Sequence, residues 1–557
     1  MDLPEKQVEI SLDENDPIIE KYLKLPHPKT LEPGTVLMII ATSAIGSIIG
    51  LELIVRLGVT ANTSIIGALI AVLFGFIPSK LFVGFRNIHR QNLVQTSISA
   101  ATFGAGNVLL LAMGTIWILG AKESLIPMFI GAAIGMLVDI IMLYWLFDTP
   151  AFPADEAWPP GIATSETILA AAEGGKRALI LIGAGIVGAI GQSFKIPMDV
   201  VGVAWIGNIY ALLMFGIGLL IRGYSPVLFG VDINKLYIPH GIMIGAGIVA
   251  LIQITLIVRG KRLTKKGSIE EAKAVEKVYV PTRTSKDIIN ALKNGFIIYT
   301  IGGLIIALIS GIYTGMSLPM LIWWIIFAAI AAEVSELMVG ISAMHAGWFP
   351  GFATALIFLV LGILMKFPPI ACGILVGYTA ATGPAFADAG YDLKTGWLLR
   401  GRGKNKEYEL FGRSQQFIAD LLGEAVALVV VGLSFTRYFS QNLFPPVDKV
   451  FAAAIQAGAQ PWLWKSLLLW GLVGAAIQYI GGAEKQIGIL FATGLLIMNP
   501  MAGFGVIVAI IVRVILEKTY GKKAETPMFI AAAGFIAGST LYSFFTSTMG
   551  LLSSKKK

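Results

Sequence analysis

The sequence predicts an all-α, polytopic membrane protein, and three observations support this fold class. Hydrophobic residues make up 56% of the 557 residues, and the mean hydropathy is +0.78. Only 14% of the residues are charged, against roughly 25% in soluble domains. The apolar residues form continuous runs of about 20, the length that spans a bilayer. A soluble chain of this composition would expose large apolar patches, and a barrel would show short alternating strands, so both classes are excluded.

Sixteen apolar runs predict about 14–16 transmembrane helices, with two or three of the runs as half-spans. They lie at about 35–57, 62–79, 93–119, 125–147, 176–193, 200–221, 238–258, 294–312, 318–340, 351–366, 368–387, 416–435, 465–481, 485–498, 501–517 and 527–547. We therefore expect a cytoplasmic segment at 1–34, one transmembrane domain at 35–550 and a basic tail at 551–557. Two halves, at about 35–258 and 294–550, would be joined by a basic loop at 259–293.

The net charge of +8 is explained by Lys and Arg in the loops between the runs, as the positive-inside rule requires. Nucleic acid is therefore not an expected partner. The most basic loops, at 80–90, 259–293 and 394–413, should all face the cytoplasm. Counting spans satisfies this rule only if one more crossing or a re-entrant segment lies between about 148 and 237.

A repeated seven-residue pattern marks one point in that interval and a second point later in the chain. WPPGIAT occupies 158–164 and WFPGFAT occupies 348–354, with five matching positions and an offset of 190 residues. Proline breaks a helix, and paired interrupted segments are the best sequence indication of a transporter binding site. An internal duplication is our interpretation, with chance as the alternative. The candidate substrate-binding residues from the two copies are Trp158, Pro160, Gly161, Thr164, Trp348, Pro350, Gly351 and Thr354.

Polar residues inside or beside the runs supply further candidates, because ionisable groups at membrane depth are usually functional. Gln95 and Thr96 suit substrate hydrogen bonds or bonds between helices. Glu166 follows the first break and His345 precedes the second, and both are further candidate substrate-binding residues. Glu166 also suits capping or proton transfer, and His345 also suits proton transfer. The single cysteine, Cys372, excludes an intrachain disulfide, and the isolated histidines do not form a metal site. We expect no metal and no cofactor.

Two pairs of carboxyl groups are candidates for proton coupling. Glu333 and Glu336 are three residues apart, and Asp420 and Glu424 are four apart, so each pair lies on one helical face. Two carboxyl groups so close do not both ionise readily, which favours one bound proton. The alternative for each pair is a buried Lys or Arg partner.

Motifs of several enzyme and motor classes are absent from the sequence. No GxxxxGK[ST], HExxH or GxSxG pattern occurs, which argues against a P-loop motor, a zinc protease and a serine hydrolase. A GxGxxG pattern runs from Gly183 to Gly188 inside an apolar run. We interpret it as small residues that allow close helix packing. An enzyme is therefore not expected.

Three stretches resemble the oligopeptide transporter family, which includes the yellow-stripe-like metal-chelate transporters. They are FPADEAWPPGIATSETILAA, which begins at Phe152, YDLKTGWLL at 391–399, and the end of the chain through GFIAGSTL. The resemblance extends over roughly 35–550. It implies a cytoplasmic loop motif that leads to a Gln-Gln pair at the start of the next span. These residues are Asp392, Leu393, Lys394, Thr395, Gly396, Gln415 and Gln416.

The sequence also departs from the peptide-transporting branch of that family. The Asn-Pro-Gly and Lys-Ile-Pro-Pro-Arg motifs are missing, and RGRGKNKEYELFGRS replaces a short turn before Gln415. The chain looks closer to prokaryotic members, which implies a prokaryotic plasma membrane.

The expected function is proton-coupled inward transport of a small peptide or a peptide-like, metal-chelating compound. Its partners would be that substrate, protons and the lipid bilayer, and a homodimer stays open. Lys394 would attract an anionic ligand or gate the exit. The alternatives are a membrane-embedded transferase, although no DDxxD pattern occurs, and a passive channel for a small solute.

Overall fold

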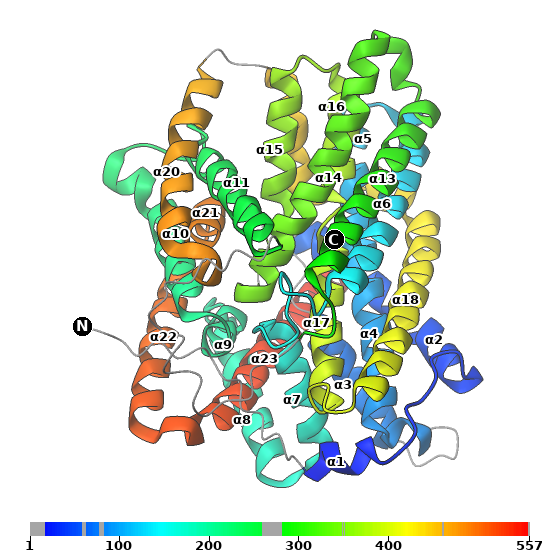
Figure 1. The fold of residues 1–557 in the computed structure, drawn as a ribbon, viewed down its shortest axis with the longest axis vertical. Coiled ribbons are helices and arrows are strands. Elements are labelled where there is room, and N and C mark those ends of the chain that lie inside the picture. Colours follow the sequence, from blue (N-terminus) through cyan, green and yellow to red (C-terminus); the bar gives the residue numbers. More distant parts are fainter. Residues whose placement is uncertain are drawn as a thin grey trace.

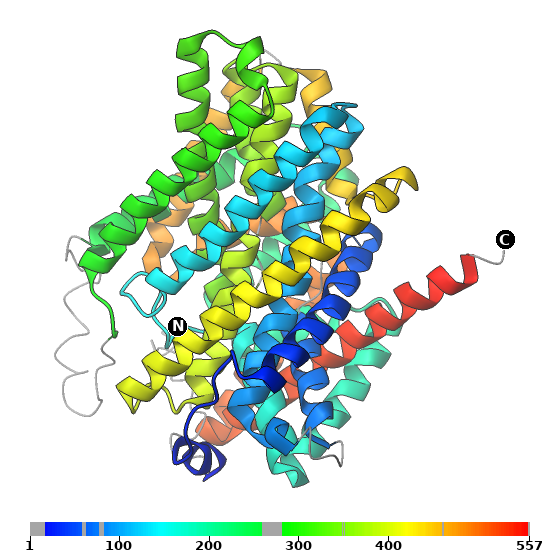
Figure 2. The same ribbon diagram turned by 90° about the vertical axis from the view of Figure 1, so that its right-hand side faces the viewer.

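The computed structural model describes residues 17–57, 63–76, 83–258, 281–347, 349, 351–458 and 462–554. Within these ranges the regular structure is helical, apart from one isolated bridge between Phe147 and Phe152. Long helices run side by side through most of the molecule (Figures 1 and 2). The predicted all-α class is therefore confirmed.

The helices are separated mostly by short turns, and seven of those named here begin with a proline at their first position. They are α1 (Pro17–Leu23), α2 (Pro33–Leu57), α3 (Thr63–Phe76), α4 (Ile88–Phe103), α5 (Leu111–Ile118), α6 (Leu125–Leu146), α7 (Pro159–Glu173), α8 (Gly175–Ser193), α9 (Met198–Ile206), α10 (Ile209–Phe229), α11 (Ile238–Val258), α13 (Ser285–Ile309), α14 (Leu318–Ala346), α15 (Gly351–Leu364), α16 (Pro369–Ala380), α17 (Pro384–Leu399), α18 (Lys406–Ser440), α19 (Pro446–Ala457), α20 (Leu463–Lys485), α21 (Ile487–Leu496), α22 (Pro500–Tyr520) and α23 (Glu525–Ser554). The seven are α1, α2, α7, α16, α17, α19 and α22. Proline suits this position because the first N–H of a helix has no intrahelical partner.

Ten helices or joined helices in the described part are long and apolar enough to cross a membrane. They are Pro33–Val55, Ile88–Ile118, Lys122–Leu146, Ile209–Phe229, Ser285–Ile309, Leu318–His345, Pro369–Leu399, Lys406–Ser440, Leu463–Gly482 and Pro500–Tyr520. Three shorter apolar helices accompany them, at Ile238–Ala250, Thr354–Leu364 and Ile487–Leu496. The chain is therefore an integral, multi-pass membrane protein, while the total of 14–16 spans stays a prediction.

Both copies of the repeated pattern stand at the start of a short helix. The first copy opens α7, which has 15 residues, and Gly351 of the second opens α15, which has 14. Helices of this length reach about 21–23 Å, less than the ~30 Å hydrocarbon core of a bilayer. The predicted breaks in the membrane segments are confirmed. Trp348 and Pro350 lie outside the described residues.

The two breaks also lie against each other. The backbone N–H of Trp158 donates to the carbonyl oxygen of Met344 over 2.8 Å. Gly347, which ends α14 with φ 66°, leaves room for Pro160, since a Cβ there would lie 2.9 Å from the Pro160 Cδ. The first copy therefore packs on the residues that lead directly into the second. Whether the copies derive from a duplication stays a prediction.

The core of the fold is built from two interrupted helical segments. One joins α4 to α5 through a π-helical stretch, Gly104–Leu110, and the other consists of α16 and α17 with a break at 381–383. Every residue of α17 is buried, and α17 contacts α4, α6, α7, α14 and α18. Any movement of α17 would therefore reach most of the core.

Close helix packing explains the GxGxxG pattern, as predicted. A Cβ on Gly188 would lie 2.5 Å from the carbonyl oxygen of Phe535, and one on Gly538 would lie within 1.8 Å of the carbonyl oxygen of Gly185. These glycines let α8 and α23 approach backbone to backbone. The pattern is thus a helix interface.

The expected loop position of the Asp392–Gly396 motif is wrong. These residues form the middle of α17, and all of them are buried. A proline at the first helical position and the apolar residues on both sides of the motif favour a helix here. In the expected basic loop at 259–293, residues 285–293 belong to α13, and 259–280 lie outside the described residues.

Candidate functional site: a cavity among helix breaks

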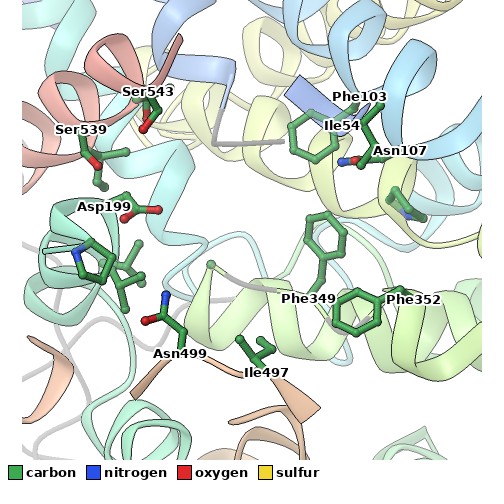
Figure 3. Close-up of a pocket in the computed structure, with 18 of the residues that line it drawn as sticks. Ile54, Phe103, Asn107, Asp199, Phe349, Phe352, Ile497, Asn499, Ser539 and Ser543 are labelled. Atoms are coloured by element: carbon green, nitrogen blue, oxygen red, sulfur yellow. The ribbon is translucent and has the colours of Figure 1, made fainter. Parts of the chain in front are cut away.

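A cavity of about 330 Å³ lies where four helices begin, a volume within the usual range for ligand sites. Its wall includes residues at the starts of these helices: Asp199 of α9, Phe352 of α15, Pro384 of α17 and Asn499, which caps α22. Figure 3 shows Asp199, Ser539 and Ser543 on the left of the cavity and, on the right, Ile54, Phe103 and Asn107 above Phe349 and Phe352. The cavity is therefore assembled from segments far apart in the sequence.

The lining combines apolar side chains with a few polar groups. Tyr391 and Thr540 line the cavity and are each 1% exposed, and their hydroxyl groups have no hydrogen-bond partner among the described residues. Asp199 is the carboxylate of the lining, which in the described part includes no Lys, Arg or His. Helix N-termini carry partial positive charge. The wall thus offers an acidic group and several positive helix ends.

The second copy of the pattern contributes directly to this cavity. Phe349, Gly351 and Phe352 of this copy line it, together with Gly347 directly before the copy. The Thr354 hydroxyl is turned inward, donating to the carbonyl oxygen of Gly351 over 2.9 Å and lying 2.7 Å from the Ser335 hydroxyl. His345 lies just before this segment, with its Nδ1 3.6 Å from a carboxylate oxygen of Glu156.

The first copy instead packs against α17, which contributes Pro384 and Tyr391 to the cavity wall. Trp158, with φ 38°, is fully buried, and its ring meets that of Tyr391 edge-on with 6.1 Å between centroids. A Cβ on Gly161 would lie 2.5 Å from the carbonyl oxygen of Tyr391. The Thr164 hydroxyl donates to the carbonyl oxygen of Pro160 over 2.8 Å. Trp158, Pro160, Gly161 and Thr164 are not among the residues that line this cavity, and in this structure the first copy packs on α17.

Glu166 makes an ion pair inside the protein. The Arg177 guanidinium lies 2.7 Å from its carboxylate and 3.0 Å from that of Glu173. Both Glu166 and Arg177 are buried. A paired carboxylate of this kind holds α7 to α8, and this contact supports a structural role for Glu166.

The polar residues of α4 and the family-like motif bond to one another. Gln95 donates to the Asp392 carboxylate over 2.5 Å. The Gln416 amide donates to the Thr96 hydroxyl over 3.1 Å and to the carbonyl oxygen of Asp392 over 2.7 Å. A Cβ on Gly396 would lie 1.9 Å from the Gln416 Oε1. These contacts hold α4, α17 and α18 together. They support the alternative interpretation of Gln95 and Thr96, in which their side chains form bonds between helices.

Lys394 and Thr395 of the motif also bond to other parts of the protein. The Lys394 ammonium donates to the carbonyl oxygen of Ala154 over 2.7 Å and lies 4.5 Å above the Trp397 ring. The Thr395 hydroxyl lies 3.1 Å from the carbonyl oxygen of Gly161. In this arrangement the buried Lys394 side chain connects α17 to the segment before α7.

Gln415 binds the N-terminal segment. Its side-chain oxygen accepts from the Thr30 N–H over 2.9 Å, and its carbonyl oxygen accepts from the Thr30 hydroxyl over 2.6 Å. His27 of the same segment lies against His89, with 4.9 Å between ring centroids. Burial, with help from the nearby Arg400 charge, lowers the pKa of His27 to about 3, so His27 is neutral at physiological pH.

A buried ionic network, not identified from the sequence, joins the motif to two loops. Arg400 pairs with Glu409 over 2.7 Å, and Arg413 pairs with both Glu409 and Asp148 over 3.2 and 3.1 Å. The i, i+4 spacing of Glu409 and Arg413 was the available signal. The partner Asp148 lies 265 residues away in sequence, which no local pattern reveals.

Several buried carboxyl groups make no ion pair with a described residue. They include Asp139, Glu336, Asp388, Asp420 and Glu424, each at most 1% exposed, whereas Glu333 is partly exposed. Asp388 accepts from the Ser99 hydroxyl over 2.6 Å, and neither carboxylate oxygen of Glu424 has a described hydrogen-bond partner. Asp420 interacts electrostatically with Asp388, and Glu424 with Asp420 and Asp139. In the described part, no group of three or more His, Cys, Asp or Glu residues could hold a metal ion.

Comparison with known proteins identifies the family. Residues 186–549 match the family described as OPT oligopeptide transporter protein, a region that contains the second copy, α14, α17 and α18. No curated protein matches the chain. Because the match covers more than half of the 557 residues, the chain belongs to the oligopeptide transporter family, and it is a membrane transporter of a small-molecule or peptide substrate, not an enzyme.

Proposed function

We propose that this protein couples the entry of protons to the uptake of small peptides, or of peptide-like metal chelates, across the plasma membrane of a prokaryotic cell. The observation that carries the proposal is the set of buried carboxyl groups around the interrupted helices, for which no described Lys or Arg provides a counter-charge. An ionised carboxylate is costly away from water, so such groups favour a bound proton. Groups that bind and release protons at membrane depth are characteristic of proton-coupled transporters.

The chemistry of the cavity supports a substrate that carries both charges. Asp199 suits a ligand ammonium group, and the starts of α15 and α22, which carry no acidic residue in their first turns, suit a carboxylate. The rings of Phe103, Phe349 and Phe352 offer apolar contact. Short peptides and amino-acid-derived chelators combine these features.

Uptake into liposomes tests the proposal. The purified protein is reconstituted, an inward proton gradient is imposed, and a library of peptides and metal chelates is offered and measured by mass spectrometry. We expect at least one compound to accumulate above its external level. A one-unit pH gradient supports about tenfold accumulation for one proton per substrate, because one pH unit corresponds to ~1.4 kcal/mol. A protonophore should abolish this accumulation.

Asp199→Asn provides the matched test of the cavity. We expect it to weaken uptake of compounds with a free amino group and to spare those whose amine is blocked. Glu123→Gln, an exposed site between α5 and α6, serves as the control and should behave as the wild type. Failure of every compound to exceed its external level would reject proton coupling.

A further inference from the structure

One tyrosine hydroxyl joins two of the buried carboxyl groups. The Tyr299 hydroxyl of α13 lies 3.0 Å from Oδ1 of Asp139 on α6 and 2.8 Å from Oε2 of Glu336 on α14. All three side chains are fully buried. The second oxygen of Glu336 has no hydrogen-bond partner among the described residues. We call these three residues the carboxyl–tyrosine bridge.

The hydrogen count of this bridge requires an added proton. A tyrosine hydroxyl has one hydrogen to donate, so it cannot donate to both carboxyl groups. If it donates to one, it must accept from the other, and a carboxyl group donates only when it is protonated. Two carboxylates facing one hydroxyl would also leave two uncompensated charges in an apolar interior. The geometry therefore corresponds to one carboxylate and one carboxylic acid.

Asp139 is the carboxylate of the pair. Its Oδ2 accepts the backbone N–H of Gly383 over 2.6 Å and that of Phe386 over 3.2 Å. Those N–H groups belong to the start of α17, where free donors and the positive end of the helix favour a negative charge. Glu336 accepts no such backbone bond in the described part. The proton thus lies on Glu336, which donates to Tyr299, while Tyr299 donates to Asp139.

We propose that Glu336 holds the coupling proton and that Tyr299 and Asp139 transmit its presence to the break at the start of α17. The inference rests on the proposed proton-coupled function. When Glu336 loses its proton, Tyr299 faces two carboxylates and can satisfy only one. Asp139 then competes with Glu336 for the Tyr299 hydrogen bond, while its other oxygen still accepts the N–H groups of Gly383 and Phe386. Because Pro384 and Tyr391 of α17 line the cavity, the proton state of Glu336 changes the shape of the substrate site.

The other titratable groups around the bridge are acidic or phenolic. Tyr378 of α16 donates to the backbone oxygen of Tyr299 over 3.1 Å. Glu333 of α14 interacts electrostatically with Glu336, and Glu424 of α18 with Asp139. None of these groups brings a positive charge, and the salt bridges of the described residues include no partner for Asp139 or Glu336. A proton is therefore the cation that balances this cluster.

Infrared spectroscopy of the purified protein reads the bridge without any substrate. At neutral pH the wild type should show the C=O stretching band of a buried carboxylic acid. Because other buried carboxyl groups can absorb in the same region, the variants are compared with the wild type as difference spectra. Glu336→Gln should remove one component of this band, whereas Asp139→Asn should leave that component in place. Tyr299→Phe should shift the band, because Glu336 loses the group to which it donates. A band that survives unchanged in both Glu336→Gln and Tyr299→Phe would overturn the assignment.

Transport then tests the coupling. In liposomes, Glu336→Gln should reduce driven accumulation from about tenfold to onefold under a one-unit gradient, with exchange of substrate across the membrane kept within about twofold of wild type. The exposed Tyr313→Phe, in the turn after α13, is the control for a tyrosine change and should leave both assays unchanged. Driven accumulation that persists in Glu336→Gln would overturn the proposal.

The two assays separate this inference from the proposed function. A wild type that shows the Glu336 band but transports no compound against its gradient would reject proton-coupled transport and retain the protonated carboxyl group. If Glu336→Gln does not fold, Tyr299→Phe carries both tests, because it leaves Glu336 in place. Unaltered accumulation and an unshifted band in that variant would contradict the bridge.

Discussion

At the scale of single residues, the physical reason for the residue type is clearest for the glycines at helix contacts, where no space is left for a Cβ atom. Gly161 lies where the start of α7 meets the backbone of α17, and a Cβ there would lie 2.5 Å from the Tyr391 carbonyl oxygen and 2.8 Å from the Lys394 Cβ. Both neighbours belong to a fully buried helix, so neither moves easily. The sequence identified Gly161 as part of a break, but its contact with a helix more than 200 residues later could not be predicted.

We predict that Gly161→Ala destabilises the protein by about 1–3 kcal/mol, the usual cost of overpacking a well-packed core. Gly183→Ala is the matched control, because no atom lies within 4 Å of a Cβ at that position. In a helix it should be neutral or stabilising by up to ~1 kcal/mol. Thermal unfolding in detergent, followed by the loss of the monodisperse peak, measures both. Equal unfolding temperatures for Gly161→Ala and wild type would show that α7 and α17 are less tightly packed than described.

At the scale of helices, the sequence predicted interruptions better than contacts. Proline and glycine act locally, so WPPGIAT and WFPGFAT indicated two helix starts, and both are found at the described residues of these copies. The breaks before α17 and α22 also carry proline, at Pro384 and Pro500, and the same argument would have found them. Predicting which breaks meet in one cavity requires the tertiary fold.

The carboxyl pairs also show that the sequence predicts local geometry but not tertiary contacts. Spacing placed Glu333 with Glu336 and Asp420 with Glu424 on shared faces of α14 and α18. The closest partner of Glu336 is nevertheless Tyr299 of α13, and Asp139 of α6 completes the bridge. Asp139 was visible in the sequence only as an acid deep in an apolar run, because its partners lie 160 or more residues away.

At the scale of the whole molecule, the contacts at one end of the bundle fix which segments share a side. The start of α18 bonds to the segment before α13, through Arg413 and the Thr282 hydroxyl over 3.3 Å, and to α1, through Tyr408 and the Tyr22 carbonyl oxygen over 3.5 Å. From Ser285 the 25 residues of α13 extend about 37 Å, enough to cross a bilayer. The turn after α13 therefore lies on the opposite side from the turn before α18.

We predict that single cysteines at these two turns are labelled from opposite sides of the membrane. Cys372→Ser removes the one native cysteine, after which Lys404→Cys and Thr314→Cys, both at exposed positions, are placed separately. An impermeant maleimide should label Thr314→Cys in intact cells and Lys404→Cys only after lysis, because the basic 394–413 segment should face the cytoplasm. Labelling of both in intact cells would contradict the crossing by α13, and the reversed pattern would contradict the orientation.

The most direct measurement of the central claim is the movement of protons with substrate. Liposomes that contain the protein and a trapped pH-sensitive dye receive, with no imposed gradient, a compound that the uptake screen has identified. The account predicts that the interior acidifies in proportion to the substrate that enters, and that Glu336→Gln admits substrate without acidification. Entry of substrate into wild-type liposomes with no change of interior pH would contradict it.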